Sequence, residues 1–309
     1  MLENTPVSVI VPVYNEEQSL PILVERLEKT FENNNIKGAI IVVNDGSTDK
    51  TKKISEDLSK IYSNIRVLHH RRRKGKTAAL QTGFAATSED IIVMIDADLQ
   101  YAPEDLPRLL ELIEQGYDVI NGYRQHRKDS VLKKFPSFIY NLISRIFFGT
   151  PFHDFNSGFK VFRHEVIKDI NLRKDQHRFI LHLAHHKGYR VGEVAIQHFP
   201  RKYGKTKYGA SRMILGPLDL ISLGLQLAFL ERPMVLFGFT GIVMFLIGLY
   251  FSAELIILRV VYGHSISDNL PRLLVAGLLT VAGIQSFFFG FIADMIADLR
   301  SEQHKRKKP

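Results

Sequence analysis

Apolar runs alternate with amphipathic stretches along the N-terminal part of the chain. The runs predict five strands, at Val7–Val13, Ala39–Val43, Ile65–His69, Ile91–Ile95 and Asp118–Gly122. The stretches between them predict four helices. Three are at Asn15–Asn33, Thr77–Ala86 and Pro103–Gln115, and the helix that is second in chain order ends at Leu58. Ser47 or Thr48 is the expected cap of the second helix. Strands that alternate with helices at this spacing predict an α/β domain with a mostly parallel sheet and helices on both faces.

The C-terminal part has a different pattern, with long apolar runs at Met234–Leu258 and Leu273–Ile296. Each run is longer than the ~20 residues that cross a hydrocarbon core of ~30 Å. Glu254 and Asp294 lie near the ends of the runs, where a charge costs less than at the midplane. A pair of buried core helices is the alternative, and the lengths disfavour it. Two transmembrane helices are therefore predicted.

Two further segments have helical patterns. Leu132–Phe148 has one apolar face and a basic face, which fits either a core-packed helix or an amphipathic helix on a membrane surface. The predicted spans favour the membrane surface. Ser211–Leu230 is apolar but interrupted by Gly216–Pro217 and Asp219, which favours a juxtamembrane helix over a third span. The predicted division is an N-terminal domain at 1–210 with its interfacial helix at 132–148, a juxtamembrane segment at 211–232, spans at 233–298 and a basic tail at 299–309.

Charge and composition indicate the orientation in the membrane and the class of substrate. The tail contains Lys305–Lys308, and cationic flanks prefer the cytoplasmic side of a membrane. With two spans, an integral membrane protein is expected whose N-terminal domain and both termini are cytosolic. No signal peptide is predicted at Met1–Asn4. The absence of cysteine excludes disulfides and thiolate metal sites. The net charge of +9 suits phosphorylated substrates or anionic lipid, and no nucleic-acid motif accompanies it.

The strongest candidate chemistry is Asp96-Ala97-Asp98, directly after a predicted buried strand. Two carboxylates one residue apart can share a hard divalent cation, which can hold a diphosphate. Three other polar segments also follow strands or precede helices, at Val11–Glu16, Asn44–Asp49 and Lys74–Thr77. A doubly wound sheet gathers such segments along the carboxyl edge of its strands, where ligands bind. Gly-x-Gly-x-x-Gly does not follow the first strand, so dinucleotide binding lacks its fingerprint.

Each segment also has a purely structural interpretation. Asn44–Asp49 fits a turn with a helix cap, and Lys74 and Lys76 beside Arg71–Arg73 fit a solvated basic face. In the functional interpretation, the Asp45 carboxylate accepts hydrogen bonds from a nucleobase or a ribose. Lys76 and the backbone amides at the helix start then bind a phosphate. The occurrence of all these segments at successive strand ends favours the functional interpretation.

The segments VPVYNE, NDGSTD, KGKTAAL and DADLQ, in this order, resemble the family 2 inverting glycosyltransferases, which have a GT-A fold. Four later segments resemble motifs of the polyprenyl-phosphate branch, which includes dolichol-phosphate mannose synthase. They are Asn121–Arg124, His153–Lys160, His177–Ile180 and Pro200–Gly209. Tyr123 departs from the branch, which usually has a small residue before the arginine. The resemblance covers nearly the whole chain. Its motifs are specific for the family and less specific for the sugar that is transferred.

The resemblance implies roles for individual residues. Those expected around the nucleotide are Pro12, Tyr14, Glu16, Asp45, Lys76, Asp96, Ala97 and Lys207. Those expected to hold Mg²⁺ or Mn²⁺ are Asp96, Asp98 and Gln100. Those expected at the reacting centre are Asp98, Arg124, Lys133, Asp154 and Arg201. Lys133, assisted by Ser137, would meet the lipid phosphate, although a snorkelling lysine is an equal alternative. Arg201 and Lys207 would belong to a basic loop that closes over the donor. Asp154 would orient a sugar hydroxyl or tune the acceptor pocket.

The implied reaction transfers a hexosyl residue from a GDP- or UDP-linked sugar to dolichyl or undecaprenyl phosphate, with inversion. Transfer to a diacylglycerol lipid and an inert nucleotide-binding scaffold are the alternatives. A processive polysaccharide synthase is disfavoured, because its acceptor motif contains tryptophan and this chain has none. Gly238, Gly241 and Gly248 would permit close helix contact, either in a homo-oligomer or within the pair of spans.

Overall fold

The structure is a computed structural model. It describes residues 6–124, 152–155, 157–170, 172, 176–203, 233–263, 265 and 269–306. The chain divides into two compact units, Met1–Met213 and Ile214–Pro309, which we describe separately. The interfacial helix predicted at 132–148 and the juxtamembrane segment predicted at 211–232 lie outside the described residues.

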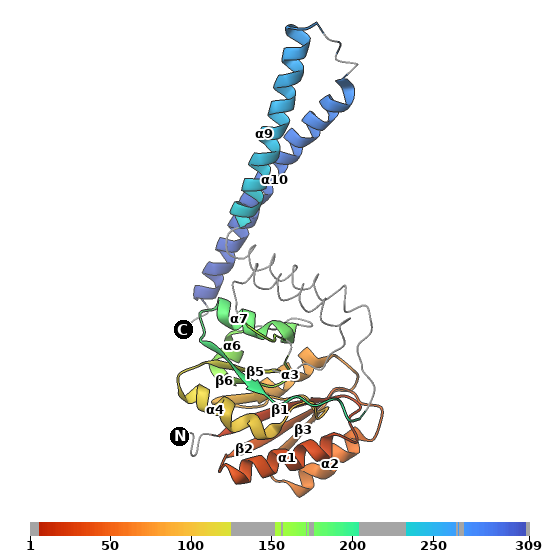
Figure 1. The fold of residues 1–309 in the computed structure, drawn as a ribbon, viewed down its shortest axis with the longest axis vertical. Helices are drawn as coiled ribbons and strands as arrows, with labels where there is room; N and C mark the ends of the chain where they lie inside the picture. Colours follow the sequence, from red (N-terminus) through yellow and green to blue (C-terminus); the bar gives the residue numbers. More distant parts are fainter. Residues whose placement is uncertain are drawn as a thin grey trace. The chain divides into compact units, whose positions relative to one another are not determined.

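A seven-stranded sheet in the order β3-β2-β1-β4-β6-β5-β7 forms the centre of the first unit (Figure 1). Its strands are β1 (Val7–Val13), β2 (Gly38–Asn44), β3 (Ile65–His69), β4 (Ile91–Met94), β5 (Val119–Arg124), β6 (Lys160–Arg163) and β7 (Val191–Ile196). Only β6 runs against its neighbours β4 and β5, and the other pairs of described strands are parallel. The predicted mostly parallel sheet is confirmed.

Helices cover both faces of this sheet, as predicted. They are α1 (Leu20–Asn33), α2 (Thr51–Ile61), α3 (Lys76–Ala85), α4 (Leu106–Glu114), α6 (His164–Asp169) and α7 (Ile180–His186), with short 3-10 helices η1 (Pro103–Asp105) and η2 (Gln176–Phe179). Val9 of β1 packs in one buried cluster with α1 and α4, whereas the next residue, Ile10, packs in a second cluster with α3 and α7. Because side chains alternate across a strand, β1 is buried on both faces, and it is apolar except for Ser8, whose hydroxyl is hydrogen-bonded to the Thr87 hydroxyl.

Two predicted helix starts are wrong, and the same contacts explain both. The backbone N–H of Asn15 donates to Ser47 Oγ at 2.9 Å, and that of Glu16 donates to Thr51 Oγ1 at 2.8 Å. The segment after β1 is thereby bonded to the loop after β2, and α1 begins only at Leu20. Ser47 is engaged in this contact and does not cap α2, which begins at Thr51. The two strand-end loops therefore support one another.

The strands β6 and β7 were not predicted from the sequence, and β6 changes the edge of the sheet. It pairs antiparallel with β4, so that Lys160 lies opposite Met94, the last residue of β4. The loop that precedes β6 therefore reaches the same edge at which β4 ends. This insertion brings Gly158 into contact with Asp96 and Tyr101, and no local pattern in the chain encodes it.

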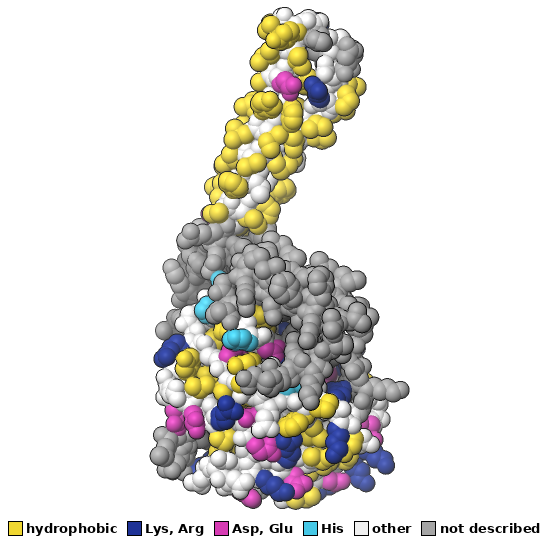
Figure 2. Space-filling model, in the orientation of Figure 1, with side chains coloured by type: hydrophobic (Ala, Val, Ile, Leu, Met, Phe, Trp, Pro, Cys, Tyr) yellow, Lys and Arg dark blue, Asp and Glu magenta, His cyan; other side chains and the backbone are white. Residues whose placement is uncertain are grey.

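The second unit contains two long helices, α9 (Pro233–Val260) and α10 (Leu270–Arg306). By length and composition, Pro233–Val260 and Leu270–Ala297 could each cross a membrane, and only 17% of each apolar window is buried. Figure 2 shows hydrophobic side chains covering this pair. A Cβ on Gly241 would lie 2.7 Å from the Gly283 carbonyl oxygen of α10, and a Cβ on Gly248 would lie equally close to the Thr280 nitrogen. These two glycines therefore serve packing within the pair.

Candidate active site

A cleft of about 190 Å³ lies at the carboxyl edge of the sheet. It is lined by residues of all four polar segments singled out in the sequence, and by η2 and the segment after β7. The lining residues are Pro12, Val13, Tyr14, Glu16, Asp45, Arg73, Gly75, Lys76, Ala79, Asp96, Ala97, Asp98, His177 and Arg201. The cleft therefore combines acidic and basic side chains on a frame of parallel strands.

Two basic side chains contact the two acids that follow β4. Lys76 Nζ lies 2.5 Å from Asp96 Oδ1, and Arg201 Nη2 lies 2.8 Å from Asp98 Oδ2. Arg201 also lies 3.8 Å from Glu16. Burial raises the pKa of Asp98, and the neighbouring charge of Asp96 raises it further, while Arg201 opposes both effects. Two carboxylates that lie close together in a partly desolvated site repel one another, and a bound cation relieves this repulsion.

This donor set fits a hard divalent cation. Carboxylate oxygens are the ligands that Mg²⁺ and Mn²⁺ prefer, and Lys76 and Arg201 already bring positive charge to them. Gln100 supports the same loop, because its backbone N–H donates to Asp98 Oδ1 at 3.2 Å. The Gln100 amide nitrogen donates to the Phe199 carbonyl oxygen at 3.5 Å, so the side chain also contacts the segment after β7.

Asp45 fixes the loop that leads into α3. Its carboxylate accepts the backbone N–H groups of Lys74 and Gly75, each at 2.8 Å. It also contacts His70 Nδ1 at 2.8 Å. Gly75 has a φ of 97°, which favours glycine, and it immediately precedes Lys76, the first residue of α3. Asp45 thereby positions Lys76 in the cleft, a role that the sequence pattern did not indicate.

Aromatic and imidazole groups complete the walls of the cleft. The Arg73 guanidinium lies 4.2 Å from the centroid of the Tyr14 ring. His177 Nδ1 lies 2.8 Å from Thr77 Oγ1. Burial lowers the pKa of His177 well below its usual value, and the charge of Lys76 contributes in the same direction. His177 therefore offers the cleft a neutral imidazole.

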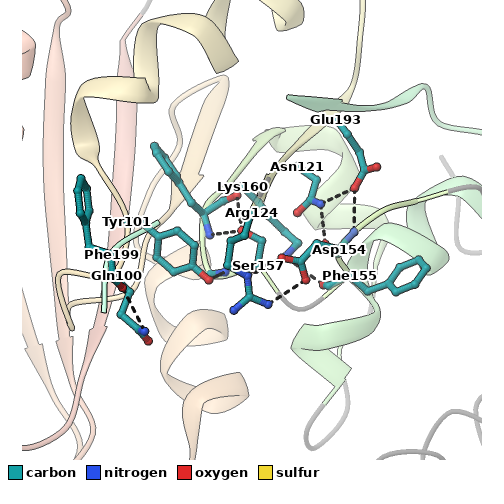
Figure 3. A network of polar contacts seen from close by, with 12 residues as sticks. Gln100, Tyr101, Asn121, Arg124, Asp154, Phe155, Ser157, Lys160, Glu193 and Phe199 are labelled. Atoms are coloured by element: carbon teal, nitrogen blue, oxygen red, sulfur yellow. Dashed lines mark hydrogen bonds and ion pairs between the residues drawn. The ribbon is translucent and has the colours of Figure 1, made fainter. Parts of the chain in front are cut away.

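A second polar network surrounds Asp154, in the loop before β6 (Figure 3). Arg124 at the end of β5 binds the Asp154 carboxylate with both ends of its guanidinium fork, Nε to Oδ2 at 2.6 Å and Nη2 to Oδ1 at 3.0 Å. The Asn121 amide nitrogen donates to the Asp154 carbonyl oxygen at 2.7 Å and to Glu193 Oε1 at 2.8 Å. Asp154 is thus held by its side chain and its backbone together.

Tyr101 and Lys160 connect this network to the loop of the two acids. The Gly158 N–H donates to Tyr101 Oη at 2.7 Å, and a Cβ on Gly158 would collide with the Asp96 carboxylate. Lys160 is buried and donates to the carbonyl oxygens of Phe155 and Ser157. Burial lowers the pKa of Lys160 to about 7, although the charge of Asp154 opposes this. Asp154 and Asp96 therefore lie on segments that touch.

The residues predicted from the sequence fall into three groups. One group lines the cleft, namely Pro12, Tyr14, Glu16, Asp45, Lys76, Asp96, Ala97, Asp98 and Arg201. Arg124, Asp154 and Gln100 lie in the contacts beside it. Lys133, Ser137 and Lys207 lie outside the described residues. Asn121, Lys160 and His177 lie in segments that resemble motifs of the polyprenyl-phosphate branch, but no individual role was predicted for them. Glu193 was not singled out, and its one signal is a polar side chain in an apolar segment.

Comparison with known proteins identifies related sequences over almost the full length. The family described as Glycosyl transferase family 2 matches residues 8–170. An undecaprenyl-phosphate 4-deoxy-4-formamido-L-arabinose transferase of Pseudomonas syringae is 32% identical over 303 residues, covering 98% of this chain and 88% of the relative. A dodecaprenyl-phosphate galacturonate synthase of Rhizobium johnstonii is 34% identical over 309 residues, covering 96% of this chain and 89% of the relative.

Solved structures share the fold. Glucosyl-3-phosphoglycerate synthase from Mycobacterium tuberculosis, in complex with Mn²⁺, uridine-diphosphate-glucose and phosphoglyceric acid, superposes with a TM-score of 0.56 and 20% identity. The match covers 72% of this chain and 79% of that chain. It confirms the predicted GT-A-like α/β architecture of the N-terminal unit.

Proposed function

The chain belongs to glycosyl transferase family 2, and on that premise we propose that it transfers a hexosyl residue from a nucleotide-diphosphate sugar to a polyprenyl phosphate. The relatives that match almost the whole chain carry names of this reaction class, with undecaprenyl and dodecaprenyl phosphate as lipids. The observation that carries the proposal is the cleft in which Asp96 and Asp98 face Lys76 and Arg201 beside the Arg124–Asp154 pair.

The donor half of the reaction belongs to the cleft. The nucleotide would lie among Pro12, Tyr14 and Asp45, close to the start of α3. Asp96 and Asp98, with Gln100, would hold Mg²⁺ or Mn²⁺, which neutralises the charge that develops on a leaving diphosphate. Lys76 contacts Asp96 and Arg201 contacts Asp98, so these two basic side chains would exchange carboxylate contacts for phosphate contacts when the donor binds.

The acceptor half belongs to Arg124 and Asp154. A phosphate monoester has its second pKa near ~6, so a polyprenyl phosphate is already largely dianionic at neutral pH and needs no strong general base. One phosphate oxygen forms a bond to the anomeric carbon while the bond to the nucleotide diphosphate breaks, and the anomeric centre inverts. Arg124 would anchor the attacking phosphate, and Asp154 holds the guanidinium in place. Lys133 and Lys207 are proposed to add phosphate contacts.

The helices α9 and α10 would anchor the protein in the membrane that contains its lipid substrate. Their exposed apolar surfaces and lengths fit two membrane spans. We propose that the catalytic domain, residues 1–210, and both termini are cytosolic, because the C-terminal tail is basic. The amphipathic segment at 132–148 would then lie at the membrane surface, where the lipid phosphate is found. Association with a second copy is part of the same proposal.

The proposal is tested with the purified full-length protein in detergent, with Mn²⁺ and a panel of radiolabelled UDP- and GDP-linked sugars. Polyprenyl phosphate and diacylglycerol are offered in separate reactions. We expect labelled polyprenyl-phosphate sugar, which Asp98→Asn abolishes and Asp57→Asn, a change on the surface of α2, does not. Label in diacylglycerol alone would contradict the proposed acceptor. No transfer from any donor would favour an inert nucleotide-binding scaffold.

A further inference from the structure

Glu193 of β7 is a carboxylate that the proposed reaction does not use, and its side chain is only 10% exposed. It accepts the backbone N–H of His153 at 2.7 Å and the Asn121 amide nitrogen at 2.8 Å. It also contacts His153 Nδ1 at 2.9 Å and, more distantly, the Asp154 N–H at 3.5 Å. Burying a carboxylate costs free energy unless donors surround it, and here the donors belong to one loop and one neighbouring strand.

The sheet determines where this carboxylate lies. The strands β5 and β7 are parallel, and Asn121 and Glu193 are direct partners in the register. Since Arg124 belongs to the same strand as Asn121, the two strands present three side chains to one loop. Arg124 holds the Asp154 carboxylate, Asn121 holds its carbonyl oxygen, and Glu193 holds the backbone on its N-terminal side.

The rings beside this contact fit the same arrangement. Tyr123, the residue at which the sequence departs from its branch, stacks on His153 with centroids 5.0 Å apart and planes inclined by 24°. His153 is therefore held between the Tyr123 ring and the Glu193 carboxylate, although its side chain is 68% exposed. A loop residue this exposed keeps one orientation only if such contacts hold it.

We propose that Glu193 is a positioning residue for the acceptor phosphate, which acts through Asp154 and Arg124. This inference rests on the proposed function and adds a group to it. Glu193 fixes the main chain at His153 and Asp154, so the Asp154 carboxylate stays where it can hold the Arg124 fork. Losing Glu193 lets the guanidinium turn away from the phosphate. The donor cleft, which Glu193 does not line, keeps its geometry.

The test is the variant Glu193→Gln in the full-length protein, with Glu165→Gln on the exposed surface of α6 as the matched control. Glutamine keeps one acceptor oxygen, but its N–H₂ group replaces the other oxygen and cannot accept a hydrogen bond from Asn121 or His153. We expect kcat/KM for polyprenyl phosphate to fall roughly 10-fold, as for the loss of a hydrogen bond to a charged group. The KM for the nucleotide sugar should change less than about 2-fold, because its binding residues are intact. The control should match the wild type in both.

A double-mutant cycle with Asp154→Asn separates positioning from general damage. If Glu193 acts through Asp154, adding Glu193→Gln to Asp154→Asn costs little further activity. Losses that multiply, or a parallel loss of donor and acceptor kinetics, would overturn the proposal.

Hydrogen exchange provides a readout that needs no substrate. In Glu193→Gln, and not in the control, the backbone amides of His153 and Asp154 should exchange faster. Unchanged exchange overturns the positioning role whatever the acceptor is. A wild-type protein that transfers no sugar to polyprenyl phosphate contradicts the proposed function instead, so the two failures are distinguishable.

Discussion

Replacing Lys76 with methionine is expected to strengthen Mn²⁺ binding by the nucleotide-free protein. Lys76 Nζ lies 2.5 Å from Asp96 Oδ1, with the two side chains 20% and 26% exposed. A divalent cation that binds Asp96 must displace this ammonium group or share the carboxylate with it. Methionine keeps an unbranched chain of similar length and removes the charge, so the carboxylate becomes available to the metal.

The structure sets the size of the effect. Exposed ion pairs contribute only ~0.2–1 kcal/mol, and the Lys76–Asp96 pair is more buried than those. Two unit charges 4 Å apart attract by about 4 kcal/mol at an effective dielectric constant of ~20, and desolvation offsets much of this. We expect a gain of about 1–2 kcal/mol, which corresponds to a roughly 5- to 30-fold lower dissociation constant for Mn²⁺.

The assay follows the electron paramagnetic resonance signal of free Mn²⁺ while the full-length protein is titrated. Lys74→Met is the control, because the Lys74 side chain is exposed on the same loop. With a nucleoside diphosphate present, Lys76→Met should bind the nucleotide more weakly than the wild type, since the lysine is then needed for phosphate. A Lys76→Met protein that is folded by thermal unfolding, and binds Mn²⁺ no more tightly than the control, would refute the reasoning.

Three further predictions follow from the described contacts. Arg124→Lys should lower kcat/KM for polyprenyl phosphate by roughly 10- to 100-fold, measured by transfer kinetics, because lysine cannot form the two-pronged contact with Asp154. Lys160→Met should remove a pH dependence of the thermal midpoint. With the folded-state pKa of Lys160 lowered to about 7, the unfolded state binds more protons between pH 7 and the ordinary lysine pKa, so the wild type gains stability relative to the variant as the pH rises through that window. Gly241→Leu should destabilise the α9–α10 pair, seen as faster proteolysis in detergent than for Gly277→Leu, because a Cβ at position 241 meets the Gly283 carbonyl oxygen whereas one at position 277 meets nothing within 4 Å. Equal proteolysis of the two glycine variants would contradict this packing.

Local pattern determined most of the elements in the N-terminal half. The bounds of β1 and β3 agree with the runs that predicted them. For β1 the physical reason is burial on both faces, which requires a strand that is apolar at almost every position. The long helices α9 and α10 follow from length and hydropathy alone. Helix starts were less well determined. The α1 helix begins at Leu20 because the preceding amides bond to the loop after β2, which is distant in sequence.

In the candidate site, too, some assignments could be made from the sequence and others could not. The acids after β4 and the polar ends of β1 and β2 could be assigned to one edge, because parallel strands bring their carboxyl ends together. The sequence alone could not assign Asp45 to the backbone of Lys74 and Gly75, because the φ of 97° at Gly75 and the path of that loop are set by packing.

Only the tertiary structure decided what surrounds Asp154. Its environment depends on the antiparallel insertion of β6 between β4 and β5 and on the pairing of β5 with β7. These pairings join segments far apart in the chain, and neither is encoded by a local period. Glu193 is one polar residue in a short apolar segment, and Lys160 ends a segment that resembles a motif of the branch, so neither residue's contacts could be assigned from the sequence. The sequence therefore determined the chemistry of the acids, and the order of the strands determined which groups hold the acceptor half of the site in place.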